Sequence, residues 1–84
     1  MLDHIDDEIK KIFFEVFPDL SESKFDWKKK QNDYNDWDSF SQLSLITMVE
    51  SKFDISITDD ESVTIRSAED MQKIVNRHKR KSDS

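Results

Sequence analysis

Residues 39–53 read SFSQLSLITMVESKF and contain the clearest helical pattern of the chain. Apolar side chains recur at spacings of three and four residues, which places them along one face of an α-helix. The pattern begins at Ser39 and ends near Phe53, so we expect a helix over 39–53. Its predicted apolar face consists of Phe40, Leu43, Ile46, Val49 and Phe53, widened by Leu45 and Met48.

The segment before this helix contains a first helix and a long connection. Pro18 cannot continue a helix and disfavours helical backbone at Phe17, so the first helix is predicted over 1–17. A loop of the length of 18–38 is unusual in a compact domain. We expect aromatic residues to hold this loop against the core. The first helix has its apolar stripe at Ile5, Ile9, Ile12, Phe13, Val16 and Phe17, and the loop carries Phe25, Trp27, Tyr34 and Trp37.

The segment after residue 53 predicts a connector and two more helices. Ile55 and Ile57 alternate with polar residues for too few positions to form a sheet, so they are expected to turn inward from an extended connector. Ser67 can cap a last helix, and Asp70 follows three residues later as in a capping box. The whole chain, 1–84, is predicted to be one domain, with a short helix over 59–65, a last helix over 67–79 and a frayed tail over 80–84.

Composition excludes several classes of protein. The 84 residues include no Cys and no Gly, and the formal net charge is −6. The chain therefore has no disulfide, no thiolate zinc site, no cysteine nucleophile and no glycine-rich phosphate loop. Its longest apolar run, Ile12-Phe13-Phe14, is too short for a membrane span or a signal peptide. We expect a soluble, acidic, cytoplasmic, all-α domain.

Three kinds of site are disfavoured by the residues themselves. A calcium loop of EF-hand type fails, because the sixth position counted from Asp33 is Asp38 where the pattern requires Gly. A hydrolytic triad is disfavoured because His4 and His78 lie near opposite ends of the chain and are expected on the surface. Nucleic acid is disfavoured as a partner because the chain is acidic overall, although residues 28–30 are all Lys.

Ser39 lies at the junction between the long loop and the clearest helix, and two interpretations of it stay open. Asp or Ser before an apolar helix is an ordinary N-cap, which satisfies free backbone N–H groups. A serine hydroxyl at a helix N-terminus is also well placed to carry a phosphate, because those N–H groups and the helix dipole stabilise an anion. Asp38 could then help an incoming enzyme to hold a divalent metal ion on that phosphate.

From Asp38 onward the chain resembles the acyl carrier proteins, which have an Asp-Ser-Leu-type motif at the start of their second helix. The resemblance spans most of the chain and is strongest over 38–75. It implies a small four-helix bundle of acyl-carrier-protein type with a long first loop. The positions that match without a gap are Asp38, Ser39, Phe40, Leu43, Leu45, Ile46, Val49, Glu50, Phe53, Ile55, Ile57, Asp59, Glu61, Ile65 and Ser67.

The resemblance also implies a function. A phosphopantetheinyl transferase would attach 4′-phosphopantetheine to Ser39, flanked by Asp38 and Phe40, and the thiol of this arm would carry an acyl thioester. Acyl-loading and acyl-transfer enzymes would be the partners of a monomer that performs no catalysis itself and binds neither nucleic acid nor membrane. An apolar interior between the helices would shelter a growing acyl chain. The alternative is a small helical interaction module of carrier-like fold that has no such arm.

Two departures from the family pattern bear on the partners. Phe40 replaces the usual Leu, and Trp37 stands where a Gly is common. The exposed side of the second helix carries Glu50 as its only acid, so we expect a specialised polyketide, glycolipid or amino-acyl pathway rather than standard fatty-acid synthesis. The residues expected to dock partner enzymes are Trp37, Phe40, Ser41, Gln42, Ser44, Thr47 and Glu50.

Overall fold

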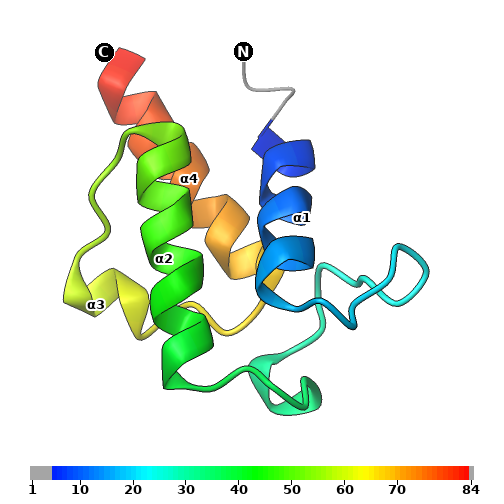
Figure 1. The fold of residues 1–84 in the computed structure, drawn as a ribbon. Coiled ribbons are helices and arrows are strands. Elements are labelled where there is room, and N and C mark those ends of the chain that lie inside the picture. Colours follow the sequence, from blue (N-terminus) through cyan, green and yellow to red (C-terminus); the bar gives the residue numbers. More distant parts are fainter. Residues whose placement is uncertain (1–4, 84) are drawn as a thin grey trace.

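The computed structural model describes the backbone of residues 5–83 and the side chains of residues 5–79. Within this range every regular element is helical and no strand occurs, so the predicted all-α class is confirmed (Figure 1). The elements are α1 (Ile5–Val16), the short 3-10 helix η2 (Gln31–Asp33), α2 (Ser39–Phe53), α3 (Asp59–Ser62) and α4 (Ala68–Asp83).

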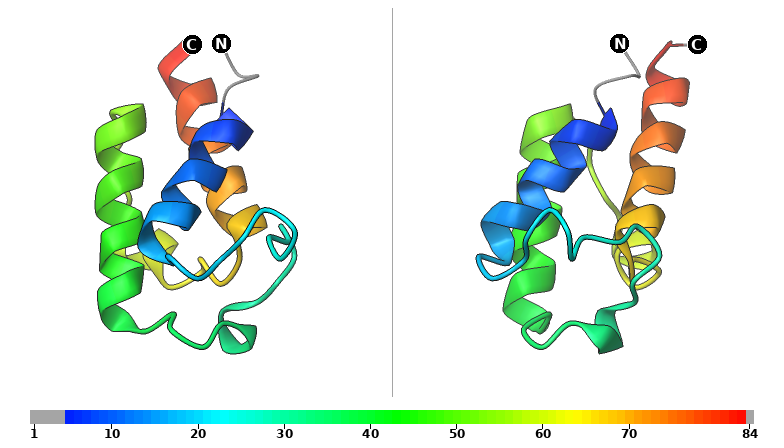
Figure 2. Two further views of the ribbon diagram at one scale, coloured as in Figure 1. Left: turned by 45° about the vertical axis from the view of Figure 1, so that its right-hand side comes forward. Right: turned by 90° about the vertical axis from the view of Figure 1, so that its right-hand side faces the viewer.

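The three longer helices form a small bundle. Helix α1 packs against both α2 and α4. Figures 1 and 2 show that α2 and α4 run in one direction and α1 in the opposite direction, while the short α3 lies beside the first half of α2. In the described residues, no helix is both long enough and apolar enough to cross a membrane.

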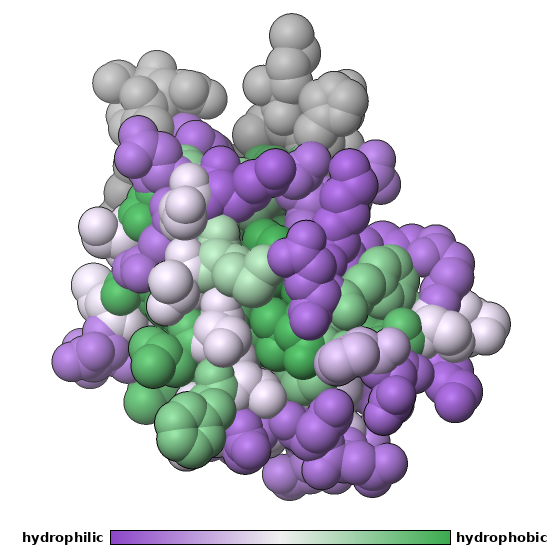
Figure 3. All heavy atoms as spheres, in the orientation of Figure 1, coloured by the Kyte–Doolittle hydropathy of each residue, from purple (hydrophilic) through white to green (hydrophobic). Residues whose placement is uncertain are grey.

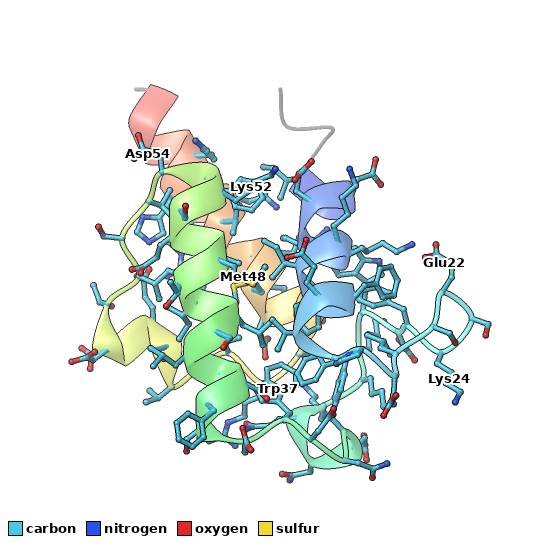
Figure 4. All side chains as sticks on the ribbon, in the orientation of Figure 1. Glu22, Lys24, Trp37, Met48, Lys52 and Asp54 are labelled. Atoms are coloured by element: carbon cyan, nitrogen blue, oxygen red, sulfur yellow. The ribbon has the colours of Figure 1, made fainter. Side chains whose placement is uncertain are left out.

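Helix α2 has the predicted bounds, and its ends have clear physical causes. Asp38 has extended backbone, and its carboxylate accepts the backbone N–H of Ser41. At the other end, Asp54 adopts the left-handed conformation, with φ 56° and ψ 52°, and donates its N–H to the Glu50 carbonyl. Glycine usually fills this position, and Asp is among the few other residues that tolerate it. In this chain, which has no glycine, α2 thus ends at an aspartate, Asp54 (Figure 4).

The other three helices differ from the predicted bounds. Helix α1 ends at Val16, one residue before the predicted end, and residues 1–4 lie outside the described part. Helix α3 is shorter than 59–65, because the chain turns after Ser62 and thereby buries Ile65. Helix α4 begins at Ala68 and continues to Asp83, so the frayed tail predicted for 80–84 is wrong over 80–83; Ser84 is not described.

The cap of α4 explains where this helix starts, and the composition of α4 explains its length. Ser67 is fully buried and its hydroxyl accepts the N–H of Asp70 at 3.1 Å, as predicted. The Asp70 carboxylate accepts the N–H of Arg66 at 3.0 Å, so the cap reaches one residue further back than a standard capping box. Lys and Arg are good helix formers, and their charges suit the C-terminal end of a helix. A basic end therefore extends α4 instead of fraying it.

The long loop is held to the core by what we call the aromatic cluster. Its members have ring centroids between 5.0 and 6.4 Å apart. Two backbone hydrogen bonds add to it, from Gln31 N–H to the Arg66 carbonyl at 2.6 Å and from Glu69 N–H to the Trp27 carbonyl at 2.9 Å. The expectation that aromatic residues hold the loop is confirmed. The cluster consists of Phe13 in α1, Phe17 directly after α1, and Phe25, Tyr34 and Trp37 in the loop.

The face that α2 turns to the core differs from the predicted one. Leu45, Val49 and Phe53 are buried, as expected, whereas Phe40 and Leu43 are exposed to solvent. At 100° per residue, positions 40 and 43 point away from 45 and 49, so the two sets cannot share one face. The apolar stripe predicted for the first half of this helix is therefore wrong. The connector residues Ile55 and Ile57 are half-buried against the core, as predicted.

Candidate functional site

Ser39 is the first residue of α2 and its side chain is exposed. The neighbouring Asp38 acts as the N-cap, with its Oδ1 accepting the Ser41 N–H at 2.9 Å. This hydrogen bond lowers the pKa of the Asp38 carboxyl below its ordinary value and outweighs the opposing effect of desolvation. Among the described residues, none forms a hydrogen bond with the Ser39 hydroxyl. The N-cap of α2 is thus Asp38, and the exposed hydroxyl of Ser39 takes no part in the capping.

The start of α2 provides an environment that favours negative charge. The first backbone N–H groups of a helix have no carbonyl partner within the helix, and the helix dipole places partial positive charge at the same end. In this 15-residue helix, the first hydrogen bond between a backbone N–H and the carbonyl four residues earlier joins Gln42 to Asp38 at 2.9 Å. An anionic group on the Ser39 hydroxyl would lie beside these N–H groups.

A surface groove of about 760 Å³ adjoins Ser39. It lies between the η2 segment of the long loop, the first turn of α2 and the chain that leads from α3 to α4. Most of its lining side chains are polar, and two of them carry positive charge. The lining residues are Lys30, Gln31, Asn32, Ser39, Gln42, Ser62, Val63, Ile65 and Arg66.

Gln42 forms hydrogen bonds to several of the segments around this groove. Its Oε1 accepts the indole Nε1–H of Trp37 at 2.7 Å, and its Nε2 donates to the Ser62 carbonyl at 2.9 Å. A longer contact of 3.4 Å joins Nε2 to the Ile65 carbonyl. Gln31 adds a bond of 3.2 Å from its side-chain amide to the Trp37 carbonyl. One glutamine therefore links the long loop, α2 and the α3–α4 connection next to Ser39.

The surface around Ser39 also carries large apolar side chains, which we call the apolar patch. Phe40 is 82% exposed, Leu43 62% and Val63 70%, and no other large hydrophobic residue in the described part is comparably exposed. Figure 3 shows hydrophobic side chains gathered over the first turns of α2 and the neighbouring α3. Exposed apolar patches on small monomers often mark binding sites.

The seven residues expected to dock partners fall into four groups. Trp37 is 6% exposed and belongs to the aromatic cluster beneath the first turn of α2 (Figure 4), so its ring is not offered to a partner. Phe40 lies in the apolar patch. Three members use their side chains in hydrogen bonds. Ser41 Oγ donates to the Asp36 carbonyl at 2.7 Å, Glu50 Oε2 accepts the Ile57 N–H at 2.7 Å, and Gln42 is bonded to Trp37 and Ser62 as described above. The side chains of Ser44 and Thr47 are exposed.

The sequence does not predict two contacts that the structure shows. Gln42 was assigned to the exposed side of α2, yet it lies three residues before Leu45 and seven before Val49, which is the spacing of one helix face. This spacing is a sequence signal that places Gln42 on the core-facing side of α2. His78 was expected on the surface, but its Nε2 lies 3.0 Å from each carboxylate oxygen of Glu61. This second contact joins α3 to α4 and has no local sequence signal; His4 is outside the described residues.

No family model, curated protein or solved structure matches this chain. The site is therefore assigned from its own residues, namely an exposed serine hydroxyl, a helix N-terminus and a polar groove. Across the residues whose side chains are described, no group of three or more His, Cys, Asp or Glu is placed to hold a metal ion. The chemistry that this arrangement supports best is attachment of an anionic group to Ser39.

Proposed function

We propose that the chain is an acyl carrier protein that bears 4′-phosphopantetheine on Ser39. The observation that carries the proposal is the Ser39 hydroxyl at the N-terminus of α2, which is exposed and bonds to no described residue while Asp38 performs the capping. The resemblance that begins at Asp38 supplies the identity of the group. The arm would provide a thiol for thioester formation, which a chain without cysteine lacks.

The residues of this chain fit the attachment of such a group. Ser39 Oγ is the nucleophile, and it attacks the phosphorus that bears the pantetheine in coenzyme A. The adenosine 3′,5′-bisphosphate leaves, and the Oγ proton passes to the transferase. The free N–H groups and the dipole of α2 stabilise the negative charge of the resulting phosphodiester. Lys30 and Arg66 line the adjoining groove and add positive charge on that side.

The partners proposed for the carrier are a phosphopantetheinyl transferase and enzymes that load and transfer acyl groups. The exposed part of α2 next to Ser39 offers Phe40, Leu43, Ser44 and Thr47, none of which is charged. Such a face is suited to apolar and hydroxyl contacts rather than to a basic patch on a partner. We therefore place the carrier in a specialised pathway, such as polyketide, glycolipid or amino-acyl transfer.

The apolar patch also favours a second candidate, a helical interaction module without a phosphopantetheine arm. Phe40, Leu43 and Val63 would serve a protein partner whether or not Ser39 is modified. The two candidates differ in what they require of the Ser39 hydroxyl. A carrier needs this oxygen, whereas an interaction module does not.

A labelling experiment separates the two candidates. The protein is incubated with a fluorescent coenzyme A conjugate and a broad-specificity phosphopantetheinyl transferase, and covalent fluorescence is measured after denaturing electrophoresis. We expect labelling of the natural chain and of Ser44→Ala, which removes an exposed hydroxyl further along the same helix. Ser39→Ala is expected to lose all labelling while it melts at the same temperature. Equal labelling of Ser39→Ala, or none of the natural chain, would contradict the carrier function.

A further inference from the structure

Gln42 closes the route from the Ser39 groove to the interior. Its amide is bonded on both sides, to the Trp37 indole and to the carbonyls of Ser62 and Ile65. An alkyl chain entering between α2 and the α3–α4 connection would have to break these bonds. The indole N–H of Trp37 would then be buried without a partner, which is costly for a polar group.

The interior behind Gln42 is already filled. Leu45 and Val49 of α2 are fully buried, as is Met71 of α4, and Ile65 is 1% exposed. Interiors of this kind are packed as closely as organic crystals and do not accept extra methylene groups without strain. The apolar interior implied by the resemblance is therefore occupied by the protein's own side chains in this structure.

The groove outside Gln42 has a different chemistry. The exposed amide of Asn32 can donate hydrogen bonds to a ligand, and Lys30 and Arg66 are exposed cations at the same groove. In the described part of the chain, neither cation forms an ion pair. Donors and cations of this kind favour a ligand with oxygen acceptors or negative charge, and they disfavour a bare alkyl chain.

From these features, and resting on the proposed function, we propose that the carrier takes a short acyl group with oxygen acceptors, such as a carboxylated acyl group. The group is held in the surface groove and not between the helices. Gln42 sets this preference, because its carboxamide separates the polar groove from the core. The cargo is therefore small and polar, and no growing chain is sheltered between the helices.

The test compares three loaded forms of the full chain. The transferase loads the natural protein from coenzyme A, malonyl-coenzyme A or octanoyl-coenzyme A, and the melting temperature and the ¹H–¹⁵N spectrum of each product are recorded. We expect the malonyl group to shift signals of Gln31, Asn32 and Arg66. The octanoyl form is expected to melt within about 2 °C of the form that carries only the arm. A rise of more than about 5 °C with octanoyl, together with shifts at Leu45 and Val49, would overturn the inference, since burying even two methylene groups has an effect of that size.

Variants of the groove sharpen the test. Gln42→Leu replaces the amide with an apolar side chain and is expected to let octanoyl raise the melting temperature above that of the same variant with the arm alone. Lys30→Gln combined with Arg66→Gln changes only exposed side chains and is expected to abolish the shifts caused by malonyl. If the double variant keeps these shifts, the groove is not the binding site. If no loaded form is obtained at all, the proposed function fails and this inference fails with it, whereas loading followed by octanoyl burial overturns the inference alone.

Discussion

The aromatic cluster and the apolar patch use large apolar side chains in opposite ways. In the cluster, Phe13 is fully buried and contacts four other rings at centroid distances of 5.6 to 6.4 Å. In the patch, Phe40 is 82% exposed on the first turn of α2. Both are phenylalanines in one small chain, so burial and not residue type distinguishes a stabilising side chain from one available for binding.

The two regions also differ in charge. Around α1, several charged side chains form ion pairs: Lys52 of α2 lies 2.9 Å from Glu8, and Lys10 lies 2.8 Å from Glu22 in the loop (Figure 4). Around Ser39, the exposed part of α2 is uncharged, and no described residue pairs with Lys30 of the adjoining groove. A small chain has little apolar surface to spare for its core. The exposure of the patch therefore supports the binding role proposed for the surface around Ser39.

The largest expected effect comes from truncating one phenylalanine in each region. Phe13→Ala should lower the free energy of unfolding by about 3–5 kcal/mol, because it removes the centre of the aromatic cluster. Phe40→Ala should change it by less than about 0.5 kcal/mol, because the ring is exposed. Urea denaturation measures both. Similar losses in the two variants would show that the patch is part of the core and would remove the contrast.

Acid is expected to destabilise the folded chain through carboxylates outside the patch. The pKa of Glu61 is lowered from its ordinary 4.5, mainly by the hydrogen bond from the Thr58 backbone and further by the His78 side chain. The pKa of Glu8 is lowered chiefly by its bond to Lys52. A carboxyl whose pKa is lower in the folded state stabilises that state above pH 4.5, and the stabilisation is lost as the pH falls through the folded pKa.

The measurement is the urea midpoint between pH 7 and pH 3. Glu61→Gln should lose stability at pH 7 and show a weaker dependence on pH than the natural chain. Asp60→Asn is the matched control, because Asp60 lies in the same first turn of α3 and is exposed. It should keep the acid dependence of the natural chain. An identical pH profile for Glu61→Gln and the natural chain would contradict the prediction.

Adjacent residues at the start of α2 provide the next test. Asp38→Ala removes the N-cap and should cost about 1 kcal/mol of stability. Ser39→Ala should cost less than about 0.5 kcal/mol, since its hydroxyl bonds to nothing in the described chain. Thermal or urea unfolding measures the pair. A larger loss for Ser39→Ala than for Asp38→Ala would mean that Ser39 is a structural cap after all.

The smallest expected effect concerns Tyr34, the only tyrosine of the chain. Its buried hydroxyl forms no hydrogen bond with any described residue, and burial, together with Asp26 and Asp36, raises its pKa to about 12. Tyr34→Phe should leave stability unchanged or raise it by up to about 1 kcal/mol at pH 7. In the natural chain, stability should fall above pH 10, where the unfolded phenol ionises first. Absorbance of phenolate in the folded protein at pH 10 would contradict this.

The sequence predicted much of the fold because local signals were consistent. Pro18, the cap at Ser67 and the apolar spacing of 39–53 fixed most helix bounds to within a few residues. The orientation of α2 was predicted less well, since apolar residues occupy both of its faces and periodicity alone does not choose between Phe40 and Leu45.

The candidate site was predicted only in part, for a related reason. The position of Ser39 at a helix start followed from local sequence. The groove did not, because it depends on contacts between residues far apart in sequence, such as Gln42 with Ser62 and Gln31 with Arg66. The polarity of Gln42 predicts an exposed side chain, although its position lies on the core-facing stripe of α2.

The central claim is that Ser39 is the point of attachment for the only reactive thiol of the protein. The most direct measurement is the intact mass of the unmodified full chain after incubation with coenzyme A and a phosphopantetheinyl transferase. The account predicts a gain equal to one phosphopantetheine group, which fragmentation of the chain locates on Ser39. An unchanged mass, or an adduct on any other residue, would contradict the account.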